Sequence, residues 1–203
     1  MNNFFSLYYL LGLGVGTGVR LRYGRRHKDA ELTESRTEHP GVMAFMALWG
    51  ISQLLPLLYL LTGWLAFADY TLPTWAGWIG VVLFTAGVWL LWRSHVDLGD
   101  NWSGSLEVRQ AHTLVIWGVY RHIRHPMYAA HILWAMGQPL LIQNWLAGWL
   151  ALFAIVPLVI LRIPVEEELM LNRFGAHYAA YSKQTGRLLP KFGPRGSDRL
   201  PTL

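Results

Sequence analysis

The chain alternates between long apolar runs and shorter polar segments. The apolar runs fall at about residues 4–19, 42–68, 75–92, 126–142 and 145–163. Most of them are close to the roughly 20 residues that an α-helix needs to cross a ~30 Å hydrocarbon core. The pattern therefore predicts an all-α integral membrane protein with five transmembrane helices.

The connections between the runs add detail to this prediction. Only Gln143 and Asn144 separate the fourth run from the fifth, so these two helices are expected to form an antiparallel hairpin. Pro56 and Pro157 fall inside runs and predict kinks rather than helix ends, because neighbouring helices can satisfy the freed backbone groups. No small-residue cleavage site follows the first run, so we expect it to remain in the protein.

Composition narrows the class of protein. The chain has 203 residues, of which 53% are hydrophobic, and it includes eleven Trp, unlike an average soluble domain. It contains no cysteine, which excludes disulfides, thiolate metal sites and a cysteine nucleophile. The net charge of +5 alone is compatible with nucleic acid, an anionic ligand or a membrane surface as partner.

The positions of the charges decide among these partners and predict an orientation. All seventeen Lys and Arg lie in three segments, within 20–36, 93–124 and 162–199, whereas residues 69–74 and 143–144 contain none. The positive-inside rule then places the N-terminus outside and the C-terminus in the cytoplasm. A basic cytoplasmic face suits anionic lipids, so we expect membrane lipids and no nucleic acid as partners. Interfacial aromatic belts are predicted at Trp64, Trp75, Trp78, Trp145 and Trp149.

A glycine-rich stretch, LGLGVGTG at 11–18, resembles the glycine-rich loop with which soluble Rossmann-type methyltransferases hold their cofactor. Such a loop follows a strand and opens a helix within repeated strand–helix units, and that context is missing from this sequence. The better interpretation pairs Gly12 with Gly16 and Gly14 with Gly18, as small residues that let a membrane helix approach its neighbour closely.

Polar residues collect in two segments, 98–128 and 162–190, which the predicted hairpin brings together. These segments resemble the isoprenylcysteine carboxyl methyltransferase family over roughly residues 75–192. The resemblance rests on HTLV at 112–115, GVY at 118–120, RHPMY at 124–128, Arg162 with the acidic run 166–168, FGAHYAAY at 174–181, and Leu189 with Pro190. We accordingly expect a single membrane domain over 1–203, with a two-helix part at 1–74, a methyltransferase core at 75–192 and a disordered tail at 193–203.

The resemblance implies a multi-pass membrane enzyme that uses S-adenosylmethionine to methylate a lipophilic acceptor entering from the bilayer, at a pocket on the cytoplasmic side. It implies catalytic roles for Arg162 and Glu166, with Arg162 also binding the acceptor. The cofactor contacts that it implies fall on Glu107, His112, Thr113, Leu114, Val115, Gly118, Tyr120, Arg124, His125, Pro126, Met127, Tyr128 and Glu166.

Physical chemistry supports the RHPMY element as an anion site. Pro126 suits the first turn of a helix, where its missing N–H is not needed, and the free amides of that turn can bind the cofactor's carboxylate. Arg124 and His125 would flank the same carboxylate. The alternative is purely topological, with the basic residues only anchoring the helix inside the cell, but it does not account for Tyr128.

The acidic segment also has a simpler interpretation. Arg162 and Glu166 are four residues apart and could form an ordinary helical salt bridge, although Pro164 is expected to disturb regular pairing and a charge near a membrane span tends to mark a site. Glu167 and Glu168 are interpreted as a solvated helix face. His131 is expected to make a helix-to-helix hydrogen bond rather than to act in catalysis. The sequence has no recognisable metal-ligand spacing, so no metal is expected.

Three alternatives remain open. The methyl acceptor could be a phospholipid amine or a small thiol instead of an isoprenylcysteine carboxylate. The chain could be a nicotinamide-dependent reductase, because membrane sterol reductases resemble its C-terminal region. It could also be a transporter or a non-enzymatic scaffold, although no inverted repeat is evident.

Overall fold

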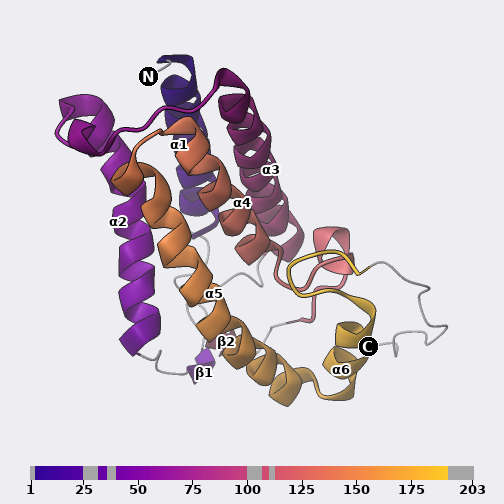
Figure 1. Cartoon of the computed structure of the whole chain (residues 1–203). Coiled ribbons are helices and arrows are strands. Elements are labelled where there is room, and N and C mark those ends of the chain that lie inside the picture. Colours follow the sequence, from indigo (N-terminus) through magenta and orange to yellow (C-terminus); the bar gives the residue numbers. More distant parts are fainter. Residues whose placement is uncertain (1–2, 25–31, 36–39, 100–106, 110–112, 192–203) are drawn as a thin grey trace.

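The computed structural model describes residues 3–24, 32–35, 40–99, 107–109 and 113–191, and these residues form a helical bundle (Figure 1). The elements are α1 (Asn3–Gly24), β1 (Leu32–Ser35), α2 (Pro40–Thr62), η2 (Ala66–Ala68), α3 (Thr74–Leu98), β2 (Glu107–Arg109), η4 (Gly118–Arg121), α4 (Pro126–Leu141), α5 (Trp145–Phe174) and α6 (Ala176–Gln184).

Within the described part of the chain, four helices, α1, α2, α3 and α5, are long and apolar enough to cross a membrane. The expected span over 126–142 corresponds to α4, which has only 16 residues and so is about 24 Å long. It begins at Pro126 and ends at a tight turn before Asn144, and these two boundaries limit its length. Five spans therefore remain a prediction, whereas the all-helical architecture is confirmed apart from the short antiparallel pair of β1 with β2.

The last run extends further than predicted. Instead of ending near residue 163, α5 has 30 residues and continues through Pro157 and Pro164. Pro56 likewise lies inside α2, so both prolines that were predicted to be internal are within helices. The long α5 matters for function because its last turns carry the acidic run beyond the apolar part of the bundle.

The expected hairpin between α4 and α5 is present, and it closes on a polar anchor. The Asn144 side chain caps α5 by accepting from the amides of Leu146 and Ala147, at 3.1 and 3.0 Å. Its amide nitrogen donates to the carbonyl of Leu65 and to Asp69, at 2.7 and 2.8 Å. The connection from α2 to α3 and the hairpin turn thus meet at one end of the bundle.

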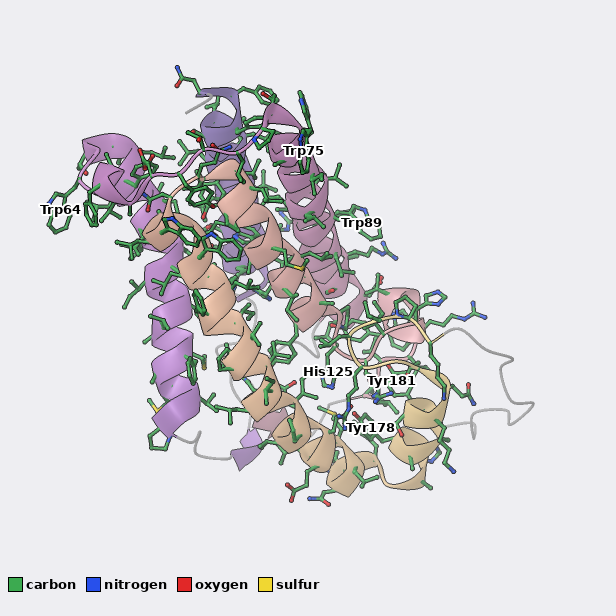
Figure 2. The ribbon with its side chains drawn as sticks, viewed as in Figure 1. Trp64, Trp75, Trp89, His125, Tyr178 and Tyr181 are labelled. Carbon is green, nitrogen blue, oxygen red and sulfur yellow. The ribbon has the colours of Figure 1, made fainter. Side chains whose placement is uncertain are left out.

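Aromatic side chains surround that end. Trp64, Trp75, Trp78 and Trp145 have exposed fractions of 53–72%, and Figure 2 shows Trp64 and Trp75 far from His125 and α6. This placement agrees with the predicted interfacial belt. The bundle therefore has an aromatic end and, opposite to it, an end formed by the start of α4, the end of α5 and α6.

The glycines of α1 behave in two ways. A Cβ on Gly12 would meet the ring of Phe84 on α3 at 2.2 Å, and one on Gly16 would meet the indole of Trp134 on α4 at 2.5 Å. These two glycines therefore permit close packing, as predicted. Gly14 and Gly18 have no atom within 4 Å of an added Cβ, so their predicted role in helix packing is wrong.

Candidate active site

The first turn of α4 begins at a proline and has no side-chain cap. Pro126 is the first helical residue, as predicted, and no side chain caps the turn; the preceding His125 is the N-cap residue. The segment before the helix is held by the chain that follows α6. The amides of Arg124 and His125 donate to the carbonyls of Gly186 and Arg187, at 2.8 and 3.0 Å. The helix N-terminus is thus fixed in place, and no side chain caps it.

Glu166, on the last turns of α5, joins the two helices. Its Oε1 accepts from the hydroxyl of Tyr128 at 2.5 Å and from Nε of Arg162 at 3.0 Å. Its Oε2 lies 3.6 Å from Nδ1 of His125. The predicted site residues of both segments therefore meet around one carboxylate, at the end of the bundle where α4 begins.

The salt bridge between Arg162 and Glu166 forms within the helix despite Pro164, so the expectation that this proline disturbs the pairing is wrong. Proline removes its own N–H and leaves the side-chain spacing of its neighbours intact. The pair is also more than a surface salt bridge. The side chain of Arg162 is only 9% exposed, and its Nη1 lies 3.3 Å from the sulfur of Met46 on α2.

Glu167 is the centre of a second cluster, and its interpretation as part of a solvated helix face is wrong. Its Oε1 accepts from Nε of Arg124 at 3.0 Å, and its Oε2 lies 2.7 Å from Nη2 of Arg187. The side chain is 14% exposed. Glu168, one residue later, is exposed as predicted. The partners of Glu167 come from distant parts of the chain, and no local spacing indicated them.

Arg124 is used mainly to hold the fold together. Its Nη1 donates to the carbonyls of Ser182, at 2.8 Å, and of Thr185. Together with the contact to Glu167, these bonds tie the start of α4 to α5 and to the end of α6. Its Nε and Nη1 thus have protein partners, and a direct contact of Arg124 with the cofactor remains a prediction.

His125 lies between the two clusters and is nearly buried. Its Nε2 is 3.4 Å from Oε1 of Glu167, and its Nδ1 faces Glu166. Burial disfavours the imidazolium, but the two facing carboxylates outweigh burial and raise the pKa of His125 above its ordinary value. A protonated His125 beside the open first turn of α4 would add to the attraction of that turn for an anion.

The segment before α4 contributes the remaining predicted cofactor residues. Val115 and Tyr120 are buried, Leu114 is half-buried and Thr113 is exposed. Gly118 has φ +59° and lies against the carboxylate of Asp97, which accepts from the amide of Val119 at 2.8 Å. The hydroxyl of Tyr181 on α6 donates to the carbonyl of Tyr120 at 2.7 Å. Figure 2 shows Tyr178 and Tyr181 at the same end as His125.

For two of the predicted cofactor residues, the structure shows no contact at the candidate site. His112 lies outside the described residues. Glu107 is in β2, where it pairs with Ser35 of β1. Their predicted contacts with the cofactor therefore remain predictions, as do those of Met127 and Tyr128 in the first turn of α4.

A cavity of about 480 Å³ leads from this site into the bundle. It lies among α1, α2, α4 and α5, and apolar side chains such as Trp49, Ile155 and Leu158 form most of its wall. Tyr128 and Arg162 also line it, so the charged cluster and the apolar space share a boundary. The volume is within the range of roughly 300–1,000 Å³ that is usual for ligand sites.

His131 makes the predicted helix-to-helix hydrogen bond. Its Nε2 lies 3.1 Å from Nη1 of Arg20 on α1, and its Nδ1 lies 2.6 Å from the carbonyl of Met127. Both Arg20 and His131 line the cavity, although sequence reasoning had given neither a part in a binding site. Within the described residues, the side chains form no cluster suited to a metal ion.

Comparison with known proteins finds similar sequences that cover the segments of the candidate site. Residues 78–172 match the sequence model of the isoprenylcysteine carboxyl methyltransferase family. The chain is 24% identical over 144 residues to protein-S-isoprenylcysteine O-methyltransferase A of Arabidopsis thaliana, covering 70% of this chain and 73% of that protein. It is 32% identical over 106 residues to the Schizosaccharomyces pombe protein-S-isoprenylcysteine O-methyltransferase, covering 51% and 45%.

A solved structure of a eukaryotic intramembrane Ras methyltransferase, an isoprenylcysteine carboxyl methyltransferase, has a similar fold. The TM-score is 0.50 at 25% identity, and the match covers 76% of this chain and 54% of that one. Together with the long apolar helices, this similarity identifies a multi-pass membrane protein. The family match includes the start of α4 and the acidic run of α5, and so all of Tyr128, Arg162 and Glu166, whereas Arg187 of the second cluster lies beyond it.

Proposed function

Because residues 78–172 match the model of the isoprenylcysteine carboxyl methyltransferase family, we propose that the chain belongs to this family and transfers a methyl group from S-adenosylmethionine to the carboxylate of a lipophilic, isoprenylcysteine-type acceptor. The observation that carries the proposal is the boundary between the apolar cavity and the Tyr128–Glu166–Arg162 cluster. An oily acceptor in the cavity would present its polar end to that cluster.

The proposal includes a membrane orientation. We place the aromatic end of the bundle outside and α6 with the charged clusters in the cytoplasm, with α4 as a short fifth span. The supporting observation is that Arg162, Arg173, Lys183, Arg187 and Lys191 follow the apolar part of α5, while the α4–α5 turn contains no Lys or Arg. A soluble methyl donor would then enter from the cytoplasm, and the acceptor would enter from the bilayer.

The donor groups at the start of α4 fit S-adenosylmethionine. The uncapped first turn suits the carboxylate of its amino acid part, and the raised pKa of His125 favours an imidazolium beside that turn. Glu166 and the ring of Tyr128 suit its cationic portion. We assign these residues to cofactor binding, with Gly118 and Tyr120 shaping the adjoining wall.

S-adenosylmethionine supplies a methyl group on a cationic sulfur, and a carboxylate with a pKa near 4 is already ionised as a nucleophile at neutral pH. The protein therefore needs no general base, and its task is to hold donor and acceptor in line and to exclude water. Arg162 is positioned to orient the acceptor's carboxylate. Glu166 fixes Arg162 and offsets part of its charge, so that the nucleophile is not held too tightly.

Incubation of purified protein with methyl-labelled S-adenosylmethionine and an S-farnesylcysteine tests the proposal. We expect label in a base-labile ester, with turnover lost in Arg162→Ala and in Glu166→Ala while both variants remain folded in detergent. Full activity in both variants at saturating substrate would contradict the assignment of the site.

The same assay separates the other acceptors. An amine or a thiol must lose a proton before it attacks, so its methylation would rise with pH over the acceptor's own pKa and would yield a base-stable product. Binding of NADPH in place of S-adenosylmethionine would indicate a reductase. Either outcome would replace the proposed activity.

A further inference from the structure

Arg20 is a cation on the wall of the cavity. It lies 17 residues after the start of α1, about 25 Å along the helix, and it borders the same space as Tyr128 and Arg162. The family match begins at residue 78, so α1 lies outside it. A charge beside the apolar part of a membrane bundle is costly, and such charges usually belong to a binding site or a transport path.

The hydrogen bonds of His131 fix how Arg20 is held. Nδ1 of His131 lies 2.6 Å from the carbonyl of Met127, and a carbonyl can only accept, so Nδ1 carries the proton. Nε2 is then free to accept from Nη1 of Arg20, at 3.1 Å. The ring of Trp49 on α2 packs edge-on against this imidazole, with 5.1 Å between the centroids. Neutral His131 thus orients the guanidinium without neutralising it.

No carboxylate of the described residues lies within ion-pair distance of Arg20; its one hydrogen bond there is to His131. A guanidinium has five N–H donors, and the bond to His131 uses one of them. Arg162 differs in this respect. Its Nε is engaged by Glu166 and its Nη1 contacts the sulfur of Met46. Among the described residues, an anion entering the cavity would therefore find an arginine on α5 that is paired with a carboxylate and an arginine on α1 that is not.

We propose that Arg20 binds the carboxylate of the lipophilic acceptor from the α1 side, opposite Arg162, and thereby selects acceptors with an anionic end. The proposal rests on the proposed function and extends the site to a helix outside the matched region. Arg20 acts as a positioning and specificity residue, and the hydrogen bond to His131 orients its guanidinium. The shared chemistry is a single anionic group, so the phosphate of an anionic lipid is the competing occupant.

The test compares Arg20→Gln and Arg20→Lys with Arg22→Gln, a matched control two residues later on α1 that is exposed, as Arg20 is, but does not line the cavity. For each protein, KM and kcat are measured with an S-farnesylcysteine, together with the inhibition constant of its carboxamide. The assays are run in neutral detergent, and again in phosphatidylcholine vesicles with and without phosphatidylglycerol.

Arg20→Gln is expected to raise the KM for the acceptor about ten- to a hundredfold, the range for a lost charge-assisted hydrogen bond. The KM for S-adenosylmethionine and the inhibition by the carboxamide should change less than about twofold. Arg20→Lys should recover part of the loss, and Arg22→Gln should match the wild type. If Arg20→Gln does not fold, the Arg20→Lys variant still tests the proposal. Its preference for the carboxylate over the carboxamide is expected to be severalfold smaller than that of the wild type.

Three results would overturn the proposal. The first is an Arg20→Gln protein with the acceptor KM of the wild type. The second is equal weakening of the carboxylate and carboxamide ligands, which indicates a packing role only. The third is an effect that appears only with phosphatidylglycerol, which assigns Arg20 to lipid phosphate. If the wild type itself methylates no carboxylate, the proposed function fails instead, and direct binding of the two ligands to wild type and Arg20→Gln still tests Arg20.

Discussion

Replacement of Glu166 by Gln is the sharpest perturbation of the candidate site. The substitution keeps the size of the side chain and one acceptor oxygen but removes the negative charge. In the structure that charge accepts from Tyr128 and Arg162 and faces His125. The variant therefore leaves the guanidinium of Arg162, 9% exposed, without its carboxylate while the packing stays nearly unchanged.

The magnitude follows from the contacts. Removing one partner of a buried ion pair costs about 3–5 kcal/mol, and a bond to a charged group contributes about 1.5–3 kcal/mol. Since Gln keeps one acceptor and the Glu166 side chain is 23% exposed, the lower range applies. A loss of about 2 kcal/mol lowers the unfolding midpoint by about 4–8 °C in a chain of this size. The same loss in the positioning of Arg162 lowers kcat/KM at least about tenfold.

The assay is methyl transfer to an S-farnesylcysteine together with thermal unfolding in detergent. Glu168→Gln is the matched control, because Glu168 is on the same helix and exposed, and it should resemble the wild type in both measurements. Equal behaviour of the Glu166 and Glu168 variants would refute the view that Glu166 organises the site.

Three further predictions follow from the neighbouring contacts. The facing carboxylates raise the pKa of His125 in the folded protein. The protonated imidazole therefore stabilises the fold fully below the ordinary histidine pKa near 6.5, and this stabilisation is lost as pH rises through the raised pKa. The unfolding midpoint should fall over that pH interval. Arg124→Lys removes the guanidinium that hydrogen-bonds both α5 and α6 and should lower the free energy of unfolding by about 2 kcal/mol. Gly16→Leu places a side chain against the indole of Trp134 on α4 and should lower the free energy of unfolding by about 1–3 kcal/mol.

Each of these has a direct check by thermal unfolding. A variant in which Gln replaces His125 should lose the pH dependence, and an unchanged profile would contradict the assignment. Arg121→Lys, on the exposed surface of η4, and Gly18→Leu, with open space around it, are the controls for the other two. A control as destabilised as its test variant would indicate that the specific contact contributes nothing.

The meeting of two distant segments was predictable because both adjoin a short hairpin. Gln143 and Asn144 force α4 and α5 to run side by side, so RHPMY and the acidic run had to share one end of the bundle. The i, i+4 spacing allowed the contact of Arg162 with Glu166 as the simpler interpretation, and the expectation that Pro164 disturbs it was wrong. Local spacing could not predict that Glu167 binds Arg124 and Arg187, because these residues come together only after α6 folds back.

Apolar length alone predicted helix boundaries less well. The run at 126–142 became the short α4, and the run ending near 163 became a helix that ends at Phe174, because polar side chains at its end are held by tertiary ion pairs. Arg20 was counted only as one of the basic residues that orient the chain. Its place on the cavity wall depends on the packing of α1 against α4, which a sequence pattern does not specify.

A structure with S-adenosylhomocysteine and a farnesylated acceptor bound would test the arrangement most directly. We predict the sulfur between the start of α4 and the end of α5, beside Tyr128 and Glu166, with the isoprenoid in the cavity and its carboxylate between Arg20 and Arg162. A cofactor bound at the aromatic end of the bundle, or an acceptor outside the cavity, would contradict the account.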